Sequence, residues 1–239
     1  MKLELLDLEF GYTSPIFKKL SLKIDGSSFI SVLGENNSGK TTLLKILNGE
    51  IKSNNLTLND TKPTKRLLND IVYYVDKECL FFSKTVYDEL MLYTSDEYKI
   101  KKALQTFKMK KSINKSPNSL PDDEKIILKI IIGYLKDPKI LLMDNIFSCF
   151  SIQKKYFVLK IIKKYCSKNK IGVVLTTNNL YDSIYSDELY IINNGKLTSN
   201  FEKSNISLPF SYELSEKLRL YELIDEDEFN LEKLAEKLC

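Results

Sequence analysis

A nine-residue loop constrains most strongly what this chain can fold into. Residues 34–42 read Gly-Glu-Asn-Asn-Ser-Gly-Lys-Thr-Thr, which fits the pattern G-x-x-x-x-G-K-[ST]. The apolar run 29–33 precedes the loop and the apolar run 43–47 follows it, so a strand, a glycine-bounded loop and a helix are expected in succession. Inward-pointing backbone N–H groups and the positive end of a helix attract phosphate groups. The loop therefore predicts a nucleoside triphosphate site.

Individual residues of the loop have separate expected roles. Lys40 is placed to reach the β- and γ-phosphates, and the Thr41 hydroxyl to coordinate Mg²⁺. Asp144 closes the apolar run 140–143, about a hundred positions later, and is predicted to be a second Mg²⁺-binding acid at the carboxyl edge of the sheet. The predicted nucleotide-binding loop residues are Gly34, Glu35, Asn36, Asn37, Ser38, Gly39, Lys40, Thr41 and Thr42.

Composition limits what surrounds this loop. The chain has 239 residues, of which 43% are hydrophobic, enough for one large α/β domain or for a core with a small appendage. The net charge of +4 is modest, and the lysines are spread through the chain, so solvated surfaces are favoured over a nucleic-acid interface. The four cysteines show no metal-binding spacing and are predicted to be free thiols in a reducing cytosol.

The hydrophobic pattern predicts an α/β fold. Segments 3–10 and 17–24 alternate like half-buried strands, and the pattern between about 85 and 136 is helical. Strands and helices then alternate to about residue 192, which predicts a parallel sheet with helices on both faces. The expected elements of that alternation are a strand at 139–144, a helix at 152–168, a strand at 172–176, a helix at 179–185 and a strand at 188–192.

The order and spacing of these motifs resemble the nucleotide-binding cassette of ABC transporters over residues 3–196. The resemblance implies that Tyr12 stacks on adenine and that residues 71–90 carry the glutamine loop. It also implies that residues 120–124 stand in place of the LSGGQ signature. Asp144-Asn145-Ile146 stands where the family has Asp-Glu-Pro, and Thr176-Thr177-Asn178 where it has Thr-His-Asp.

Further segments resemble the energy-coupling factor group of that family. These are the S-P-x-x-L lead-in at 116–120, the T-V-x-D-[DE] segment at 85–89 and the amphipathic tail. The implied fold is a P-loop NTPase core with an antiparallel β-flank, a helical subdomain and a short C-terminal helical appendage. The implied boundaries are 1–196 for the nucleotide-binding domain, with its helical subdomain at about 85–136, and 197–239 for the appendage.

The departures from the family pattern concern hydrolysis. Asn145 replaces the glutamate that polarises the attacking water and cannot accept a proton. The resemblance implies that Thr177 stands in place of the histidine that contacts the γ-phosphate. It implies that Asp76 stands in place of the glutamine that helps to hold Mg²⁺. Asn37 replaces a loop glycine, and asparagine tolerates the left-handed backbone conformation. The signature-like residues, with a proline and three acids, are Leu120, Pro121, Asp122, Asp123 and Glu124.

The resemblance implies the ATP-binding subunit of an ABC-type importer that binds Mg·ATP with impaired hydrolysis. Its implied partners are a second ABC ATPase subunit, identical or different, and a polytopic membrane coupling protein that docks near Asp88 and Glu89. No nucleic acid is expected, and the location would be cytoplasmic, on the inner face of the membrane. Two alternatives stay open: a soluble ABC-type ATPase acting on nucleic acid or ribosomes, and a catalytically active transporter ATPase.

Overall fold

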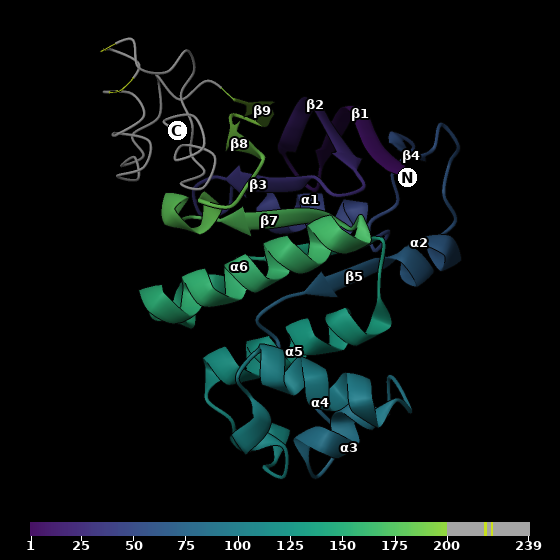
Figure 1. The fold of residues 1–239 in the computed structure, drawn as a ribbon. Coiled ribbons are helices and arrows are strands. Elements are labelled where there is room, and N and C mark those ends of the chain that lie inside the picture. Colours follow the sequence, from purple (N-terminus) through teal and green to yellow (C-terminus); the bar gives the residue numbers. More distant parts are fainter. Residues whose placement is uncertain (200–217, 219–220, 222–239) are drawn as a thin grey trace.

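Two sheets form the framework of the chain in a computed structural model, which describes residues 1–199, Leu218 and Tyr221. The larger sheet has the strand order β5-β6-β7-β3-β8-β9. Its first five strands run parallel, and β9 pairs antiparallel with β8 (Figure 1). These strands are β3 (Phe29–Leu33), β5 (Val72–Val75), β6 (Ile140–Asp144), β7 (Gly172–Thr177), β8 (Glu188–Asn193) and β9 (Lys196–Thr198).

The smaller sheet is antiparallel and lies beside the N-terminal part of the core. Its strand order is β2-β1-β4, with β1 (Lys2–Gly11), β2 (Pro15–Asp25) and β4 (Leu56–Leu58). The expected antiparallel β-flank is therefore present. Strand β2 also reaches the larger sheet through the Lys18 N–H, which donates to the carbonyl of Gly195 at 2.8 Å.

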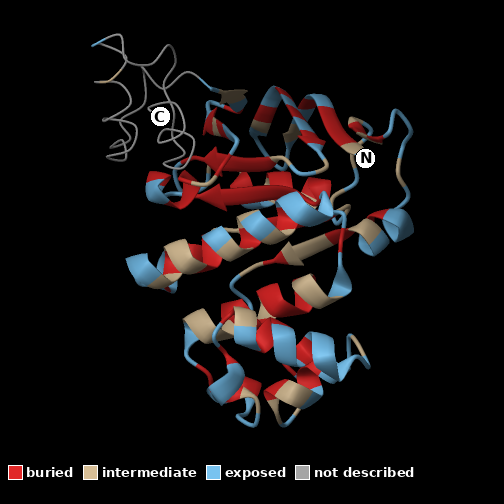
Figure 2. Cartoon of the chain, viewed as in Figure 1, coloured by how far each residue is buried: buried red, intermediate tan, exposed pale blue. Residues whose placement is uncertain are grey.

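Helices cover both faces of the larger sheet. The helix α1 packs with β1, β2 and β4 in one apolar cluster, whereas α3 to α6 pack in another on the opposite face. Figure 2 shows the burial that results from this covering. The strands β3 and β7 are buried throughout, and α6 alternates buried and exposed residues along its length. The α-helices are α1 (Lys40–Leu47), α2 (Lys65–Ile71), α3 (Val86–Met91), α4 (Glu97–Thr106), α5 (Asp122–Lys136) and α6 (Ile152–Asn169).

The predicted fold class is confirmed, with three local differences. Helix α2 was not expected, and it begins where the Thr64 side chain caps the Leu67 N–H. The helix expected at 179–185 is a short 3-10 helix, η4 (Leu180–Ser183). A short strand that was not expected, β9, follows a turn at Asn194 and Gly195. The predicted C-terminal helices lie outside the described residues. Within the part of the chain described, no helix combines the length and apolar character needed to cross a bilayer.

Glycine 133 allows α5 to pack closely on the sheet. A Cβ at this position would lie 2.6 Å from Cδ1 of Tyr73, whose ring also faces the Lys136 ammonium. Helix propensity favours alanine over glycine by about 0.8–1 kcal/mol, while overpacking costs about 1–3 kcal/mol. We therefore expect Gly133→Ala to lower the unfolding midpoint in urea. In a chain that already carries Tyr73→Ala, Gly133→Ala should not lower the midpoint further. A single variant Gly133→Ala that is more stable than the wild type would contradict this packing account.

Candidate functional site

The phosphate loop joins β3 to α1 with a backbone that only certain residues adopt. Asn37 and Gly39 both have positive φ angles, 65° and 100°. A Cβ at Gly39 would lie 2.6 Å from Cγ2 of Ile16 and 2.9 Å from the Phe17 ring, so glycine is required for space as well as for conformation. Asparagine is among the few other residues that enter the left-handed region readily. The loop therefore keeps its turn despite the replacement at 37.

The Lys40 ammonium lies inside this loop. Its Nζ donates to the carbonyls of Gly34 and Glu35, both at 2.7 Å, and only 7% of the residue is exposed. Burial lowers the pKa of Lys40 from its usual value, and the negative charge of Asp144 opposes that shift. The loop thus holds a buried cation at the N-terminus of α1, with an acid in the same cavity.

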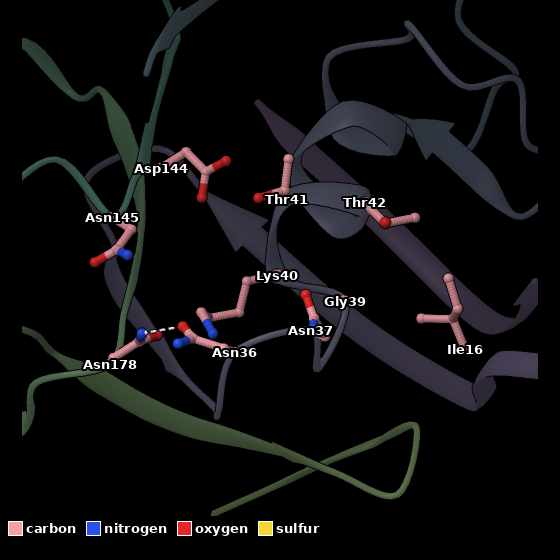
Figure 3. A pocket seen from close by; sticks show the side chains of 10 residues that line it. All are labelled: Ile16, Asn36, Asn37, Gly39, Lys40, Thr41, Thr42, Asp144, Asn145 and Asn178. Carbon is pink, nitrogen blue, oxygen red and sulfur yellow. Dashed lines mark hydrogen bonds between the residues drawn. The ribbon is translucent and has the colours of Figure 1, made fainter. Parts of the chain in front are cut away.

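A cavity of about 450 Å³ opens over the loop. Figure 3 shows the side chains converging on it from the phosphate loop, from the end of β6 and from the segment after β7. This volume falls within the range of about 300–1,000 Å³ that is usual for ligand sites. Its lining residues are Ile16, Asn36, Asn37, Gly39, Lys40, Thr41, Thr42, Asp144, Asn145 and Asn178.

The carboxylate of Asp144 is held from both neighbouring strands. Oδ1 accepts a hydrogen bond from the Thr176 hydroxyl on β7 at 2.8 Å, and Oδ2 accepts one from the Tyr74 hydroxyl on β5 at 2.9 Å. Burial, and then Asp144 itself, raise the pKa of Tyr74, which keeps this hydroxyl a donor. Thr41 and Asp144 line the same cavity, and hydroxyl and carboxylate oxygens suit Mg²⁺. These two residues would hold the ion.

Asp76 is near this edge of the sheet but is committed elsewhere. Val75 pairs with Met143, so the residues that follow them, Asp76 and Asp144, leave neighbouring strands at the same level. The Asp76 carboxylate forms an ion pair with Lys129 of α5, whose ammonium also donates to the Glu78 carbonyl at 2.8 Å. Asp76 is not among the residues lining the cavity. The expectation that it helps to bind Mg²⁺ is therefore not supported by the geometry.

The structure corrects the assignment of Thr177. This residue is 1% exposed, and its hydroxyl donates to Oδ2 of Asp182 at 2.5 Å, away from the cavity. Asp182 in turn forms a buried ion pair with Lys155 of α6 at 2.5 Å. The next residue, Asn178, lines the cavity, and its side-chain amide donates to Oδ1 of Asn36 at 2.6 Å. Asn178 therefore occupies the place assigned to Thr177.

Asn145 stands directly after Asp144 at the cavity wall. Its backbone is left-handed, with φ 50°, and its N–H donates to the Thr176 carbonyl at 2.9 Å. These features fix the side chain beside the cavity, as Figure 3 shows. A carboxamide has no basic site at neutral pH. The position is thus filled by a group that can hydrogen-bond to a water molecule but cannot take its proton.

Tyr12 lies at the tip of the β1–β2 hairpin and is 67% exposed. The ring of Phe10 meets it edge-on, with centroids 5.2 Å apart. A separate hollow of about 550 Å³ lies along this hairpin and is lined by Pro15 and Phe17. The residue between them in the chain, Ile16, lines the phosphate-loop cavity. An exposed aromatic ring can offer a face to a flat ligand.

The signature-like residues start α5, which begins at Asp122 after Pro121. Each of the three acids has a partner within the chain. Asp122 pairs with Lys125 at 3.4 Å and Asp123 with Lys154 at 2.5 Å, while Glu124 accepts from the Ser112 hydroxyl at 3.0 Å. Leu120 is buried. Acids in the first turn also interact favourably with the helix dipole. The charges at the start of this helix are therefore compensated within the chain.

Of the two expected docking acids, only Asp88 is exposed. Glu89 is 1% exposed, and its Oε2 accepts the N–H groups of Phe82 and Ser83 at 3.0 and 2.9 Å. Asp88 exchanges hydrogen bonds with Thr85 in the N-terminal cap of α3. Two apolar residues of the same segment, Leu80 and Phe82, are instead 79% and 86% exposed.

Comparison with known proteins agrees with this geometry. The sequence profile of the ABC transporter family matches residues 17–148, more than half of the chain. An energy-coupling factor transporter ATP-binding protein of Onion yellows phytoplasma is 30% identical over 84% of this chain and 79% of its own length. One from Mesomycoplasma hyopneumoniae is 26% identical over 97% of both chains. The chain belongs to the ABC transporter family, in its energy-coupling factor group.

Solved structures of this family share the fold. The cbiO1 protein of Clostridium perfringens, part of the ABC transporter complex cbiONQ, aligns with a TM-score of 0.76 at 18% identity, over 91% of this chain and 94% of its own. A structure described as the ATP binding subunit of an ABC transporter aligns with a TM-score of 0.73 at 19% identity, over 100% and 99%. The resemblance stated from the motifs is therefore confirmed, and so is the ABC-type P-loop core.

The different roles of Thr177 and Asn178 can be tested by stability. Thr177→Val removes a donor from a buried carboxylate, which should lower the free energy of unfolding by about 1–3 kcal/mol. Asn178→Ala alters an exposed side chain and should change it by less than about 0.5 kcal/mol. Urea titration of both variants measures this difference. A stable Thr177→Val beside a destabilised Asn178→Ala would contradict the assignment.

Proposed function

We propose that this chain is the ATP-binding subunit of an ABC-type membrane importer, and that it binds Mg·ATP with impaired hydrolysis beside a catalytically competent partner cassette. One observation carries the proposal. The groups that would hold a triphosphate and its metal, Lys40, Thr41 and Asp144, line one cavity. Asn145 and Asn178 line the same cavity, and we take them to stand in place of the family's glutamate and histidine.

Binding follows from the charges of the cavity. A phosphate group can take the place of the Gly34 and Glu35 carbonyls as the partner of the Lys40 ammonium, and charge-assisted hydrogen bonds are about twice as strong as neutral ones. The Thr41 hydroxyl and the Asp144 carboxylate supply oxygens to Mg²⁺, which neutralises phosphate charge. Tyr12 supplies an exposed ring for the base. Adenine is the base implied by the family.

Hydrolysis lacks its proton acceptor. Asn145 cannot act as a general base, a role that typically contributes about 10²–10⁴-fold to a rate. The chain contains no histidine at all. Asp76, the acid that could have compensated, is engaged by Lys129. No observation therefore favours the alternative of a fully active ATPase, and none favours action on nucleic acid or ribosomes.

The signature-like segment supports the same asymmetry. In the family, this segment of one cassette faces the ATP held by the other. Here Pro121 has no N–H to offer, and the three acids carry negative charge. A carboxylate about 4 Å from a phosphate oxygen is repelled by up to about 4 kcal/mol at an effective dielectric of about 20. The pairing of Asp123 with Lys154 reduces this repulsion. We infer that the segment clamps a partner's ATP weakly.

The membrane partner is proposed to dock on the segment between β5 and α3. Leu80 and Phe82 expose apolar surface there, and Glu89 fixes their loop by accepting two backbone N–H groups from inside. The docking contact would therefore be mainly apolar, and Asp88 would be its one exposed acid of the two expected from the sequence. In this arrangement the chain is peripheral on the cytoplasmic face of the membrane.

The central test is calorimetric titration of Mg·ATP into the full chain. Lys40→Ala removes a charge-assisted contact and should weaken binding by about 1.5–3 kcal/mol. Tyr12→Ala removes base stacking, worth about 1–3 kcal/mol by analogy with single-stranded nucleic acids. Two variants serve as controls, Lys45→Ala from the last turn of α1 and Tyr98→Ala from the exposed face of α4.

Both controls should bind Mg·ATP like the wild type, because each replaces the same residue type as the test variant at a position that does not line the cavity. Equal affinity in the wild type and in Lys40→Ala would refute the phosphate-loop site. A normal affinity in Tyr12→Ala would leave that site in place and would reject only the stacking role.

A further inference from the structure

Tyr74 is a residue of the site that no motif marks. It lies in β5, and its hydroxyl reaches across to β6 to donate to Oδ2 of Asp144 at 2.9 Å. Its ring packs against the apolar cluster beneath α1, on the same side of the sheet as the phosphate loop. Its neighbour Tyr73 belongs to the cluster on the opposite face, where its ring meets Gly133 and Lys136.

The two hydroxyls on Asp144 come from opposite directions. Tyr74 lies on β5 and Thr176 on β7, the two strands that flank β6, and each binds a different carboxylate oxygen. Turning the carboxylate about its bond to Cβ would break both hydrogen bonds. Each carboxylate oxygen has about two lone pairs, so both can still accept another partner. The side chain is thus fixed in direction while its capacity to bind a cation remains.

The neutrality of these donors matters because Lys40 lies in the same cavity. Asp76, Asp123 and Asp182 are all paired with lysines, which compensate their charge. A hydroxyl fixes a carboxylate without neutralising it. Held in this way, Asp144 keeps its negative charge for a metal ion and does not swing to form an ion pair with the Lys40 ammonium.

We propose that Tyr74 is a positioning residue for Mg²⁺, which with Thr176 holds the Asp144 carboxylate toward the metal that accompanies the nucleotide. This inference rests on the proposed function, because it concerns the same site. Partners that orient a metal ligand typically contribute about 10–100-fold to metal affinity. The hydroxyl should therefore affect the part of ATP binding that depends on Mg²⁺ and leave the metal-free part unchanged.

The test compares ATP affinity in excess Mg²⁺ with ATP affinity in excess EDTA, using the full chain. The ratio of the two affinities should fall by about 10–100-fold in Tyr74→Phe, which removes only the hydroxyl. It should stay at the wild-type value in Tyr73→Phe, the same change one residue earlier on the other face. Thr176→Val is a second variant, and its ratio should fall in the same way.

The outcomes separate the two proposals. A wild-type chain that binds no ATP in either condition would reject the proposed function, and this inference with it. Wild-type binding with an unchanged ratio in Tyr74→Phe would overturn this inference alone. An equal loss of affinity with and without Mg²⁺ in Tyr74→Phe would also overturn it, since it would indicate a structural role.

Discussion

The parallel pairing of β3, β7 and β6 is the constraint on which the site depends. Leu33 pairs with Thr177, and Asp144 with Thr176, so the three strands deliver the phosphate loop, the metal-binding acid and Asn178 to one edge. The strands are buried on both faces, which makes a change of register costly. Residues more than a hundred positions apart meet there because their strands end at the same level. The pairing of the strands therefore determines where the cavity lies.

Charge compensation then distinguishes Asp144 from three aspartates around the site. Asp76, Asp123 and Asp182 each form an ion pair with a lysine of α5 or α6. A buried charge without a partner is costly. Asp144 is instead held by neutral hydroxyls. The acid in the cavity is thus oriented but not neutralised, which suits a group that acts on a metal ion.

The sequence was sufficient for the features that depend on local pattern. The phosphate loop was recognisable from its glycines and lysine, and Asp144 from its place after a buried strand. The roles of Thr176 and Thr177 could not be assigned in this way, because a strand buried on both faces shows no alternation of polar and apolar residues. The role of Tyr74 depends on a contact with Asp144, 70 residues away, which no local pattern indicates. Motif alignment alone placed the histidine position at Thr177, one residue before Asn178. The partner of Asp76 is 53 residues away, and nothing local indicates it.

The proposed cassette keeps its nucleotide-binding groups and lacks a proton acceptor for hydrolysis. The most direct test follows radiolabelled Mg·ATP bound to an excess of the purified chain and measures the release of phosphate with time. We expect the bound nucleotide to stay ATP, and Asn145→Glu alone to restore little turnover, because Asn178 also replaces the histidine. Rapid phosphate release by the wild-type chain, abolished by Asp144→Ala, would contradict the account and would identify a working ATPase.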